Sequence, residues 1–350
     1  MRKSALSVGS QSSAAVAHRP PGELRSPHAA ARAYSPVLLS MLSDWRQVSC
    51  PRMKLAYLSI CAIFKDEAPY LPEWIEFHRL VGVERFFLYD NLSVDGGREV
   101  LEPWIRAGVV SISDCSIPLG QGGQGWAYAD GLERARGCTR WLAFIDLDEF
   151  LFSPGPTPLP DVLREYEDHP GVVVNWQVYG SSGHTAKPDG LVIESFVKRA
   201  RMQWVRNLRI KSIVDPTRAV RPIGPHFFEY ADGALAITED HEPVSVISVD
   251  PWTRRMRRGI SRLPLIETDP YAIRQSSVKQ VSVGRLRLNH YAVRSRQEFE
   301  QKTARHSSSR LAPRYFAYHD RNEVHDPALL SSAGEVRARL AALQDNDGTR

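Results

Sequence analysis

LAYLSICAIFKDEAPYLPEWIEFHRLVGVERFFLYD, residues 55–90, is the stretch that decides the fold. The apolar run 55–64 predicts a buried strand, and residues 84–90 predict a second strand. Between them, four side chains recur at helical spacing: Leu71, Trp74, Ile75 and His78. Pro69 suits the first turn of that helix, and Gly82 is a residue type that ends helices. The stretch therefore predicts a strand, a helix and another strand.

The same alternation continues to residue 146. We expect a helix near 97–107, a strand at 109–113, a helix from the glycine-rich loop 120–125 to about residue 136, and a strand at 140–146. Short apolar strands that alternate with amphipathic helices are typical of a parallel sheet covered on both faces. The predicted fold class is therefore α/β, with a Rossmann-like, mostly parallel sheet flanked by helices. Such sheets bind ligands outside the carboxyl ends of their strands.

The second half of the chain has a less regular pattern. Strands are expected at 171–178, 191–199, 208–214, 244–249 and 284–291, and helices at 295–305 and 333–343. We expect these strands to extend the same sheet.

The composition is that of a globular protein, with 350 residues of which 43% are hydrophobic and 24% charged. Residues 1–52 differ because they are rich in Ser, Ala, Pro and Arg without periodicity, and we expect them to be disordered. The four cysteines form no C-x-x-C pair and match no zinc site, which suits a reducing compartment. No apolar stretch is long enough to predict a transmembrane helix.

The net charge of +5 comes from dispersed arginines, and the densest cluster lies at residues 254–258. One interpretation of this cluster is a solvated surface, and the other is a patch that meets phosphate on a ligand or at a membrane. No nucleic-acid-binding module accompanies the charge, so we expect no nucleic-acid partner. The expected location is the cytoplasm, with peripheral contact to the inner face of the membrane as an alternative.

The run WLAFIDLDEF, residues 141–150, contains the main candidate site. Side chains alternate between faces along an extended segment, so Asp146 and Asp148 are expected to point the same way. Two adjacent carboxylates repel each other unless a cation lies between them, and oxygen ligands at a strand end suit Mg²⁺ or Mn²⁺. Such an ion can neutralise a diphosphate leaving group. The alternative is a solvated acidic turn after a buried strand.

Other residues have two interpretations each. Asp66 and Glu67 either cap the first helix or contact a nucleotide, and we weight the two equally. The loop 120–125 is expected to be a flexible turn, with phosphate binding by its backbone amides as the alternative. His78 is expected to be a hydrogen-bonded core histidine. Trp176 is either a platform for an acceptor sugar or a core tryptophan.

Several motifs in order along the chain resemble glycosyltransferase family 92 and its family 2 relatives. They are KDEAPYL (65–71), EWIEFH (73–78), YDN (89–91), DLDEF (146–150), GSSGH (180–184), KSIV (211–214), His226, NHY (289–291), Lys302, and Asn322 with Asp326. The resemblance covers roughly residues 55–328, and the combination is more specific than any single motif.

The resemblance implies a GT-A fold and an inverting transfer of a sugar from a nucleotide-sugar, with a UDP-sugar as the default, to a hydroxyl acceptor. The acceptor class is a glycan, a lipid or a cell-surface polysaccharide. The implied domain spans 53–330, with a nucleotide-binding half at 53–150 and an acceptor half at 151–330, followed by a C-terminal helix and tail at 331–350. Since the chain shows no membrane anchor of the animal type, we expect a bacterial, cytoplasmic enzyme.

The resemblance also implies site residues. The metal ligands for Mn²⁺ or Mg²⁺ are Asp146, Asp148 and His290. The donor-binding residues are Lys65, Glu67, Asp90, Asp130, Asp146, Lys211 and His226, and Trp176 is the acceptor candidate. An inverting enzyme needs a general base for the acceptor hydroxyl, and the carboxylates to test are Glu229, Glu239 and Asp240.

Two other functions compete with this one. Phosphatases of the haloacid dehalogenase type also use two aspartates in a D-x-D spacing, but after a first strand, whereas this pair is expected after the fourth. Phe150 also stands where those enzymes have Thr or Val. A non-catalytic module that binds a sugar or nucleotide would keep the fold without needing Asp146, Asp148 and His290.

Overall fold

A computed structural model describes residues 55–244, 278–304 and 312–347, which belong to one compact unit, Cys50–Arg350. Three sequence predictions lie outside the described residues: the disordered tail at 1–52, the strand residues 245–249 and the arginine cluster at 254–258. Within the described ranges, no helix is both long and apolar enough to span a bilayer.

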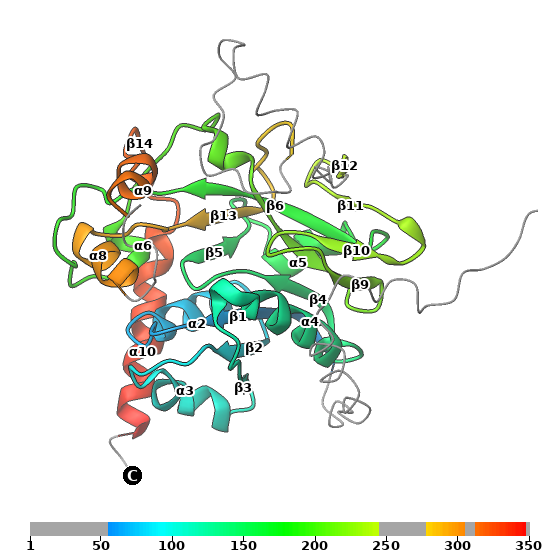
Figure 1. Cartoon of the computed structure of the whole chain (residues 1–350), viewed down its shortest axis with the longest axis horizontal. Helices are drawn as coiled ribbons and strands as arrows, with labels where there is room; N and C mark the ends of the chain where they lie inside the picture. Colours follow the sequence, from blue (N-terminus) through cyan, green and yellow to red (C-terminus); the bar gives the residue numbers. More distant parts are fainter. Residues whose placement is uncertain (1–54, 245–277, 305–311, 348–350) are drawn as a thin grey trace, which may run out of the picture. The chain divides into compact units, whose positions relative to one another are not determined.

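The first half of the chain forms the parallel part of the sheet (Figure 1). Its strands are β1 (Ala56–Phe64), β2 (Arg85–Asp90), β3 (Val110–Asp114) and β4 (Thr139–Phe144), in the order β3-β2-β1-β4. All three pairings are parallel. The connecting helices are α2 (Leu71–Leu80), α3 (Gly97–Arg106) and α4 (Gly123–Ala135). The prediction of alternating strands and helices is confirmed, because each element has the expected period and a turn residue at its end.

The second half extends the same sheet, as expected, but reverses its direction. The strand β8 (Ile210–Val214) pairs antiparallel with β4, and β6 (Gly171–Val178) pairs antiparallel with β8. Two short strands, β11 (Ala236–Ile237) and β12 (Pro243–Val244), follow β6 in the sheet order, and β12 is the last strand on that side. The carboxyl ends of β4 and β6 therefore lie on the same edge as the amino end of β8.

A second set of pairings brings distant segments to that edge. The strand β13 (Arg287–His290) pairs parallel with β6 and antiparallel with β5 (Glu149–Phe152), a strand that the sequence did not predict. The backbone N–H of Tyr291 donates to the carbonyl of Asp148 over 2.8 Å. The segment after β13 is thus fixed beside the turn that follows β4.

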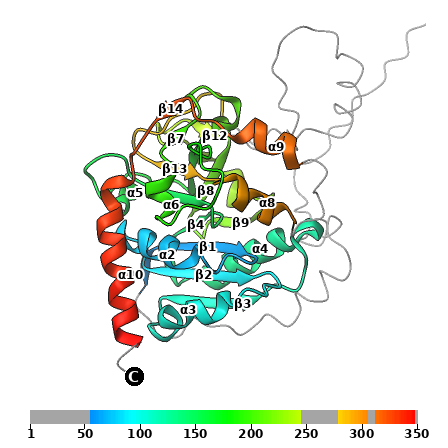
Figure 2. The ribbon, with the colours of Figure 1, turned by 90° about the vertical axis from the view of Figure 1, so that its left-hand side faces the viewer.

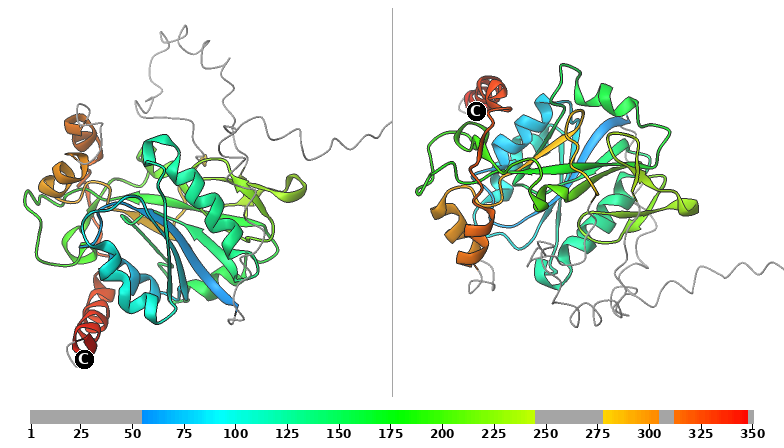
Figure 3. Two further views of the ribbon diagram at one scale, coloured as in Figure 1. Left: turned by 60° about the horizontal axis from the view of Figure 1, so that its bottom comes forward. Right: turned by 90° about the horizontal axis from the view of Figure 1, so that it is seen from above.

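Helices cover both faces of the sheet (Figure 2 and Figure 3). Along β1, Leu58 and Ile60 belong to the core cluster shared with α2, α3 and α10 (Ala333–Asp347), whereas Cys61 and Ile63 belong to the cluster shared with α4. This division follows the alternation of side chains along a strand. The C-terminal helix is part of the same core, because Val336 of α10 is fully buried there.

The predicted strand at 191–199 is wrong over most of its length. Its apolar residues form a short helix, α6 (Val192–Ser195), followed by the two-residue strand β7 (Lys198–Arg199). The carboxylate of Glu73 accepts the backbone N–H groups of Val192 and Ile193, at 2.8 and 3.0 Å. A partner far away in sequence therefore replaces the sheet hydrogen bonds that the local pattern suggested.

The remaining elements are short or peripheral. They are α5 (Leu159–Arg164), β9 (Ala219–Pro222), β10 (Phe228–Tyr230), α8 (Arg296–Ala304), α9 (Ala312–His319), β14 (Val324–His325) and the 3₁₀ turns η2 (Leu119–Gln121), η3 (Val205–Leu208), η4 (Ala231–Gly233) and η6 (Leu330–Ser332). Cys61 and Cys115 are free and buried, whereas Cys138 is disulfide-bonded.

Candidate active site

The two aspartates lie in the tight turn between β4 and β5. The backbone N–H of Glu149 donates to the carbonyl of Asp146, which closes this turn over 3.1 Å. The segment is a turn, so the alternation of side chains expected along an extended strand does not apply, and the two aspartates contact different partners. Asp146 keeps 32% of its side chain exposed and Asp148 only 9%.

Asp146 is held by side chains from two elements. The ammonium of Lys211 on β8 lies 2.8 Å from one carboxylate oxygen. Gln124 and Tyr128 from the first turns of α4 donate to the other oxygen, at 2.9 and 3.1 Å. The glycine-rich loop therefore leads directly into a helix whose first turn contacts Asp146. Burial would lower the pKa of Lys211, but Asp146 and Glu149 raise it well above its usual range, so Lys211 is charged.

Asp148 has a different pair of neighbours. Lys302 on α8 lies 2.6 Å from its Oδ2, and Nε2 of His290 lies 3.5 Å from its Oδ1. Burial would raise the pKa of Asp148, but the charge of Lys302 and the neighbouring His290 hold it well below its usual range. Asp148 is therefore an ionised carboxylate whose charge is compensated from α8.

Glu149 supports this turn from inside the protein. Its side chain is fully buried, and its Oε2 accepts the backbone N–H of Asp146 over 2.7 Å. The ammonium of Lys211 is 3.5 Å away. Burial raises the pKa of Glu149 well above its usual range. Lys211 thus lies within ion-pair distance of both Asp146 and Glu149.

The donor atoms fit a divalent cation in part. Asp148 supplies a carboxylate and His290 an imidazole nitrogen, which Mn²⁺ accepts as ligands. The Nδ1 of His290 is buried and has no hydrogen-bond partner in the described structure. Asp146 forms an ion pair with Lys211 instead. Within the described ranges, no three His, Cys, Asp or Glu side chains lie close enough together to hold a metal ion. Two of the three predicted ligands therefore meet directly.

The loop after β1 reaches the same region. Glu67 forms an ion pair with Arg294 over 3.1 Å, and Lys65 lies partly exposed two residues before it. Asp90 ends β2 and accepts the backbone N–H of Ser93 over 2.9 Å. The helix α2 has no side-chain cap, so the alternative in which Asp66 or Glu67 caps it is wrong.

Arg294 is a site residue that the sequence did not single out. Its guanidinium stacks on the ring of Tyr70 at 3.4 Å and pairs with Glu67 through Nη1. Its Nε and Nη2 are buried and have no hydrogen-bond partner among the residues described here. Its backbone has a positive φ of 50°, a strained conformation for a non-glycine residue. No local pattern marks such an arginine, because its neighbours come from the start of the chain.

Two other predicted donor-binding residues are buried. Asp130 on α4 accepts the hydroxyl of Tyr89 over 2.6 Å, and burial raises its pKa. His226 donates from Nδ1 to the carbonyl of Ile210 over 2.9 Å. Burial and the neighbouring Lys211 hold the pKa of His226 well below its usual range, so the ring is neutral. His226 therefore lies beside the site, whereas Asp130 contacts β2 through Tyr89.

Trp176 lies in the core beneath this site. Only 5% of it is exposed, and its ring packs 4.2 Å from the ring of His290 and 5.3 Å from that of His226. This geometry favours the core interpretation over a sugar platform. His78 matches its expectation, since Leu151 N–H donates to its Nε2 and its Nδ1 lies 2.8 Å from the Trp74 carbonyl.

The three candidate bases lie away from the aspartates. Glu229 forms an ion pair with Arg221 across β9 and β10. Glu239 is buried and anchors the segment before β13, because its carboxylate accepts the N–H groups of Gly284, Arg285 and Leu286.

Asp240 is exposed directly after Glu239. Both follow β11, which pairs with β6 at Val172, whereas His290 pairs with it at Val178. The Glu239 carboxylate accepts the N–H of Leu286, four residues before His290, and four residues along a strand correspond to roughly 13 Å. The structure therefore places Glu239 away from His290.

The resemblance motifs outside the D-x-D turn stabilise its surroundings. Ser181 N–H donates to Asp320 over 2.6 Å, and Ser182 N–H donates to Asn322 over 2.7 Å. Asp326 forms ion pairs with Arg199 and with Arg287 of β13. These contacts hold the GSSGH loop and β13 in place.

Comparisons with known proteins agree with this picture. The family model described as glycosyltransferase family 92 matches residues 56–238. A glycosyltransferase family 92 protein of Oryza sativa subsp. japonica is 32% identical over 182 residues, which cover 47% of this chain and 28% of the relative. A family 92 protein of Arabidopsis thaliana is 29% identical over 225 residues, covering 56% and 36%.

A galactan β-1,4-galactosyltransferase of Arabidopsis thaliana is 32% identical over 109 residues, covering 28% of this chain and 21% of the relative. The chain thus spans about a third or less of the length of these plant relatives. Among solved structures, Staphylococcus aureus TarS is 14% identical with a TM-score of 0.31, covering 46% and 47%. Glucosyl-3-phosphoglycerate synthase of Mycobacterium tuberculosis is 18% identical with a TM-score of 0.25, covering 37% and 50%.

Proposed function

The chain belongs to glycosyltransferase family 92, and from that premise we propose that it transfers a sugar from a nucleotide-sugar to a hydroxyl acceptor with the help of Mn²⁺ or Mg²⁺. The observation that supports this most directly is the D-x-D turn at the carboxyl edge of the sheet. Two carboxylates, Asp146 and Asp148, lie there among three cationic groups: Lys211 and Arg294, which are buried, and the partly exposed Lys302.

This arrangement suits a ligand that contains both a cation and an anion. A divalent ion with a diphosphate would replace both lysine pairings, because the ion satisfies the carboxylates and the phosphate oxygens satisfy the lysines. The bound ion supplies Lewis-acid stabilisation of the leaving diphosphate. Asp148 and His290 would hold the ion, joined by Asp146 once Lys211 turns to phosphate.

Arg294 has a distinct part in this proposal. Its two unpaired N–H groups are buried near Asp148, whose pKa they help to lower. A buried guanidinium recognises phosphate oxygens with good geometry. We assign to it the donor diphosphate, with Tyr70 and Glu67 keeping its plane in position.

The sugar and the acceptor are proposed from relatives and family resemblance. Several Arabidopsis relatives are galactan β-1,4-galactosyltransferases, so a UDP-hexose donor and a glycan acceptor are the first pair to test. The resemblance favours inversion at the anomeric carbon. The phosphatase alternative is less well supported, because those enzymes carry the D-x-D pair after the first strand, whereas here the turn follows β4.

The reaction itself can be followed directly. The protein would be incubated with Mn²⁺, a panel of UDP-hexoses and β-1,4-galactan oligosaccharides, while UDP release and the anomeric signals of the product are recorded by NMR. We expect UDP release with one donor and a β-linkage formed from an α-linked donor. Release of UDP with retained configuration would overturn the inverting mechanism, and absence of release with every donor would count against transferase activity.

A further inference from the structure

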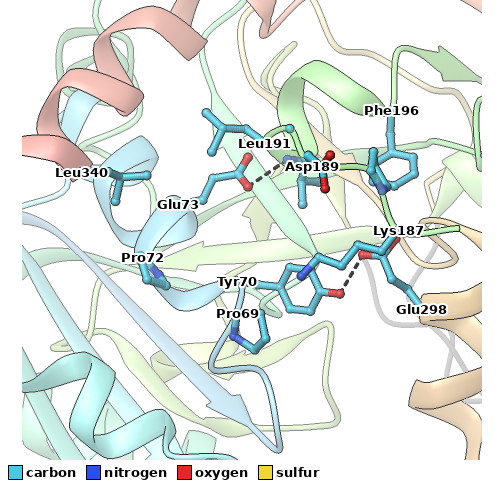
Figure 4. Close-up of a pocket in the computed structure, with 13 residues that line it drawn as sticks. Pro69, Tyr70, Pro72, Glu73, Lys187, Asp189, Leu191, Phe196, Glu298 and Leu340 are labelled. Atoms are coloured by element: carbon cyan, nitrogen blue, oxygen red, sulfur yellow. Dashed lines mark hydrogen bonds between the residues drawn. The ribbon is translucent and has the colours of Figure 1, made fainter. Parts of the chain in front are cut away.

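A cavity of about 420 Å³ lies at the start of α2 (Figure 4). It is formed by the start of α2, the segment 187–192, α8 and α10. Its lining includes Tyr70, Glu73, Lys187, Asp189, Phe196 and Glu298. Pockets of a few hundred Å³ are the usual size for small ligands. The cavity is therefore large enough for a ligand of the size of one sugar ring.

The cavity shares a wall with the proposed donor site. Tyr70 faces the cavity and stacks on Arg294, which belongs to the donor site. Glu298 accepts the hydroxyl of Tyr70 over 2.7 Å. One helical turn later on α8, Lys302 contacts Asp148 over 2.6 Å. A ligand in the cavity would thus lie next to the proposed donor site, separated from it by Tyr70 and α8.

The charges of the lining disfavour another phosphate group. Two carboxylates, Asp189 and Glu298, line the cavity against one ammonium, Lys187, while burial raises the pKa of the third acidic group, Glu73, to about 7. Lys187 also lies 4.8 Å from the centre of the Tyr70 ring, so its charge is partly engaged. An anionic ligand would be repelled by this set, whereas carboxylates are strong acceptors for hydroxyl groups.

The rest of the lining is apolar. It includes Pro69, Pro72, Leu191, Val192, Phe196 and Leu340. In Figure 4, Pro72 and Leu340 lie on the opposite side of the cavity from Asp189 and Phe196. A sugar ring has hydroxyl groups on its edge and C–H groups on its faces, and it matches a lining that is half polar and half apolar.

We propose that this cavity is a subsite for a neutral sugar unit of the acceptor, next to the unit that receives the transferred sugar. The proposal rests on the proposed function, since it takes the acceptor to be a glycan. Asp189 and Lys187 are exposed residues of the 187–192 segment, and they would hydrogen-bond to the sugar hydroxyls. Glu73 holds that segment in place through the N–H groups of Val192 and Ile193.

The test compares Asp189→Ala with Asp168→Ala, an exposed aspartate in the segment before β6, as the matched control. Binding of neutral oligosaccharides of increasing length, β-1,4-galactans included, would be measured by titration calorimetry. A uronic acid oligosaccharide is added as the charged probe. We expect the wild type to bind longer neutral chains more tightly than the monosaccharide. Asp189→Ala should lower the affinity for the longer chains about tenfold, which is the loss for one charge-assisted hydrogen bond.

Donor turnover distinguishes this inference from the proposed function. Hydrolysis of the UDP-sugar by water needs no acceptor, so its rate in the wild type reports on the proposed function alone. Equal oligosaccharide binding by the wild type and Asp189→Ala, or preferential binding of the uronic acid probe, would overturn the subsite even if donor turnover is intact. Lys187→Met serves as a second variant should Asp189→Ala fail to fold, with the same expected loss.

Discussion

Asp146 and Asp148 are two residues apart, but each faces its own lysine. The sequence predicted the chemistry of this pair because carboxylates at a strand end suggest a cation. It could not predict the orientation, because the turn between β4 and β5 breaks the alternation of side chains. Lys211 was expected near the diphosphate. Its contact with Asp146 places it in the site, and binding to the diphosphate stays a prediction.

Lys302 competes with a metal ion for Asp148 in this account. Replacing it by Met removes an ammonium 2.6 Å from the carboxylate, and the free protein should then bind Mn²⁺ several-fold more tightly. Lys198→Met, which changes an exposed lysine on β7, is the control and should leave Mn²⁺ affinity unchanged. The measurement is a Mn²⁺ titration followed by electron paramagnetic resonance. Unchanged or weaker binding by Lys302→Met would contradict the competition.

Arg294 should be essential for holding the donor. Arg294→Lys keeps a positive charge but loses the flat fork of donors, and we expect UDP-sugar binding about tenfold weaker. Arg296→Lys, two residues along and paired with Glu300 on the surface, is the matched control. Calorimetric titration with UDP checks this. If both variants bind UDP as well as the wild type, the assignment of the diphosphate to Arg294 is wrong.

At the level of elements, the first half of the fold was predictable and part of the second was not. From β1 to β4 the elements have a clear period, a Gly follows each of the three helices, and the structure matches this pattern closely. The strand β5 has no local signal because its partner β13 lies more than a hundred residues later. The helix α6 depends on Glu73, a residue of α2, and no pattern within 191–199 contains that information.

Glu73 should make stability depend on pH. Burial raises the pKa of Glu73 from 4.5 to about 7. Between these pH values only the folded protein keeps the proton, so the free energy of unfolding falls as pH rises, by at most about 3 kcal/mol. Glu73→Gln cannot titrate and should flatten this slope. Urea unfolding across that pH range is the measurement, with Glu102→Gln on the surface of α3 as the control that keeps the wild-type slope.

The helix α4 packs closely on β1, and one glycine makes this possible. A Cβ at Gly131 would lie 2.5 Å from Sγ of Cys61, whereas a Cβ at Gly125 on the same helix meets open space. Gly131→Ala should lower the free energy of unfolding by about 1–3 kcal/mol. Gly125→Ala should be neutral or stabilising, because Ala favours a helix. Equal melting temperatures for the two variants would refute the close packing.

At the scale of the whole molecule, the site combines residues that the sequence spreads from Glu67 to Lys302. The sheet order explains this, since β4, β8 and β13 place their ends on one edge. The sequence offered Glu239 and Asp240 as candidate general bases, but β11, which precedes them, pairs at the amino end of β6. Both chain halves contribute to one sheet and one site, while the functional division between them remains a prediction.

The compartment remains a prediction as well. The relatives that match are plant proteins, which does not support the expectation of a bacterial source.

Binding of a nucleotide-sugar through a metal ion at Asp148 is the central claim, and a thermal-shift measurement tests it directly. Wild type, Asp148→Asn and the surface control Asp161→Asn would be heated with a panel of nucleotide-sugars, in Mn²⁺ and in chelator. We predict that one donor raises the melting temperature only with Mn²⁺, that Asp148→Asn loses this shift, and that Asp161→Asn keeps it. A donor-induced shift of equal size in chelator, or an undiminished shift in Asp148→Asn, would contradict the account.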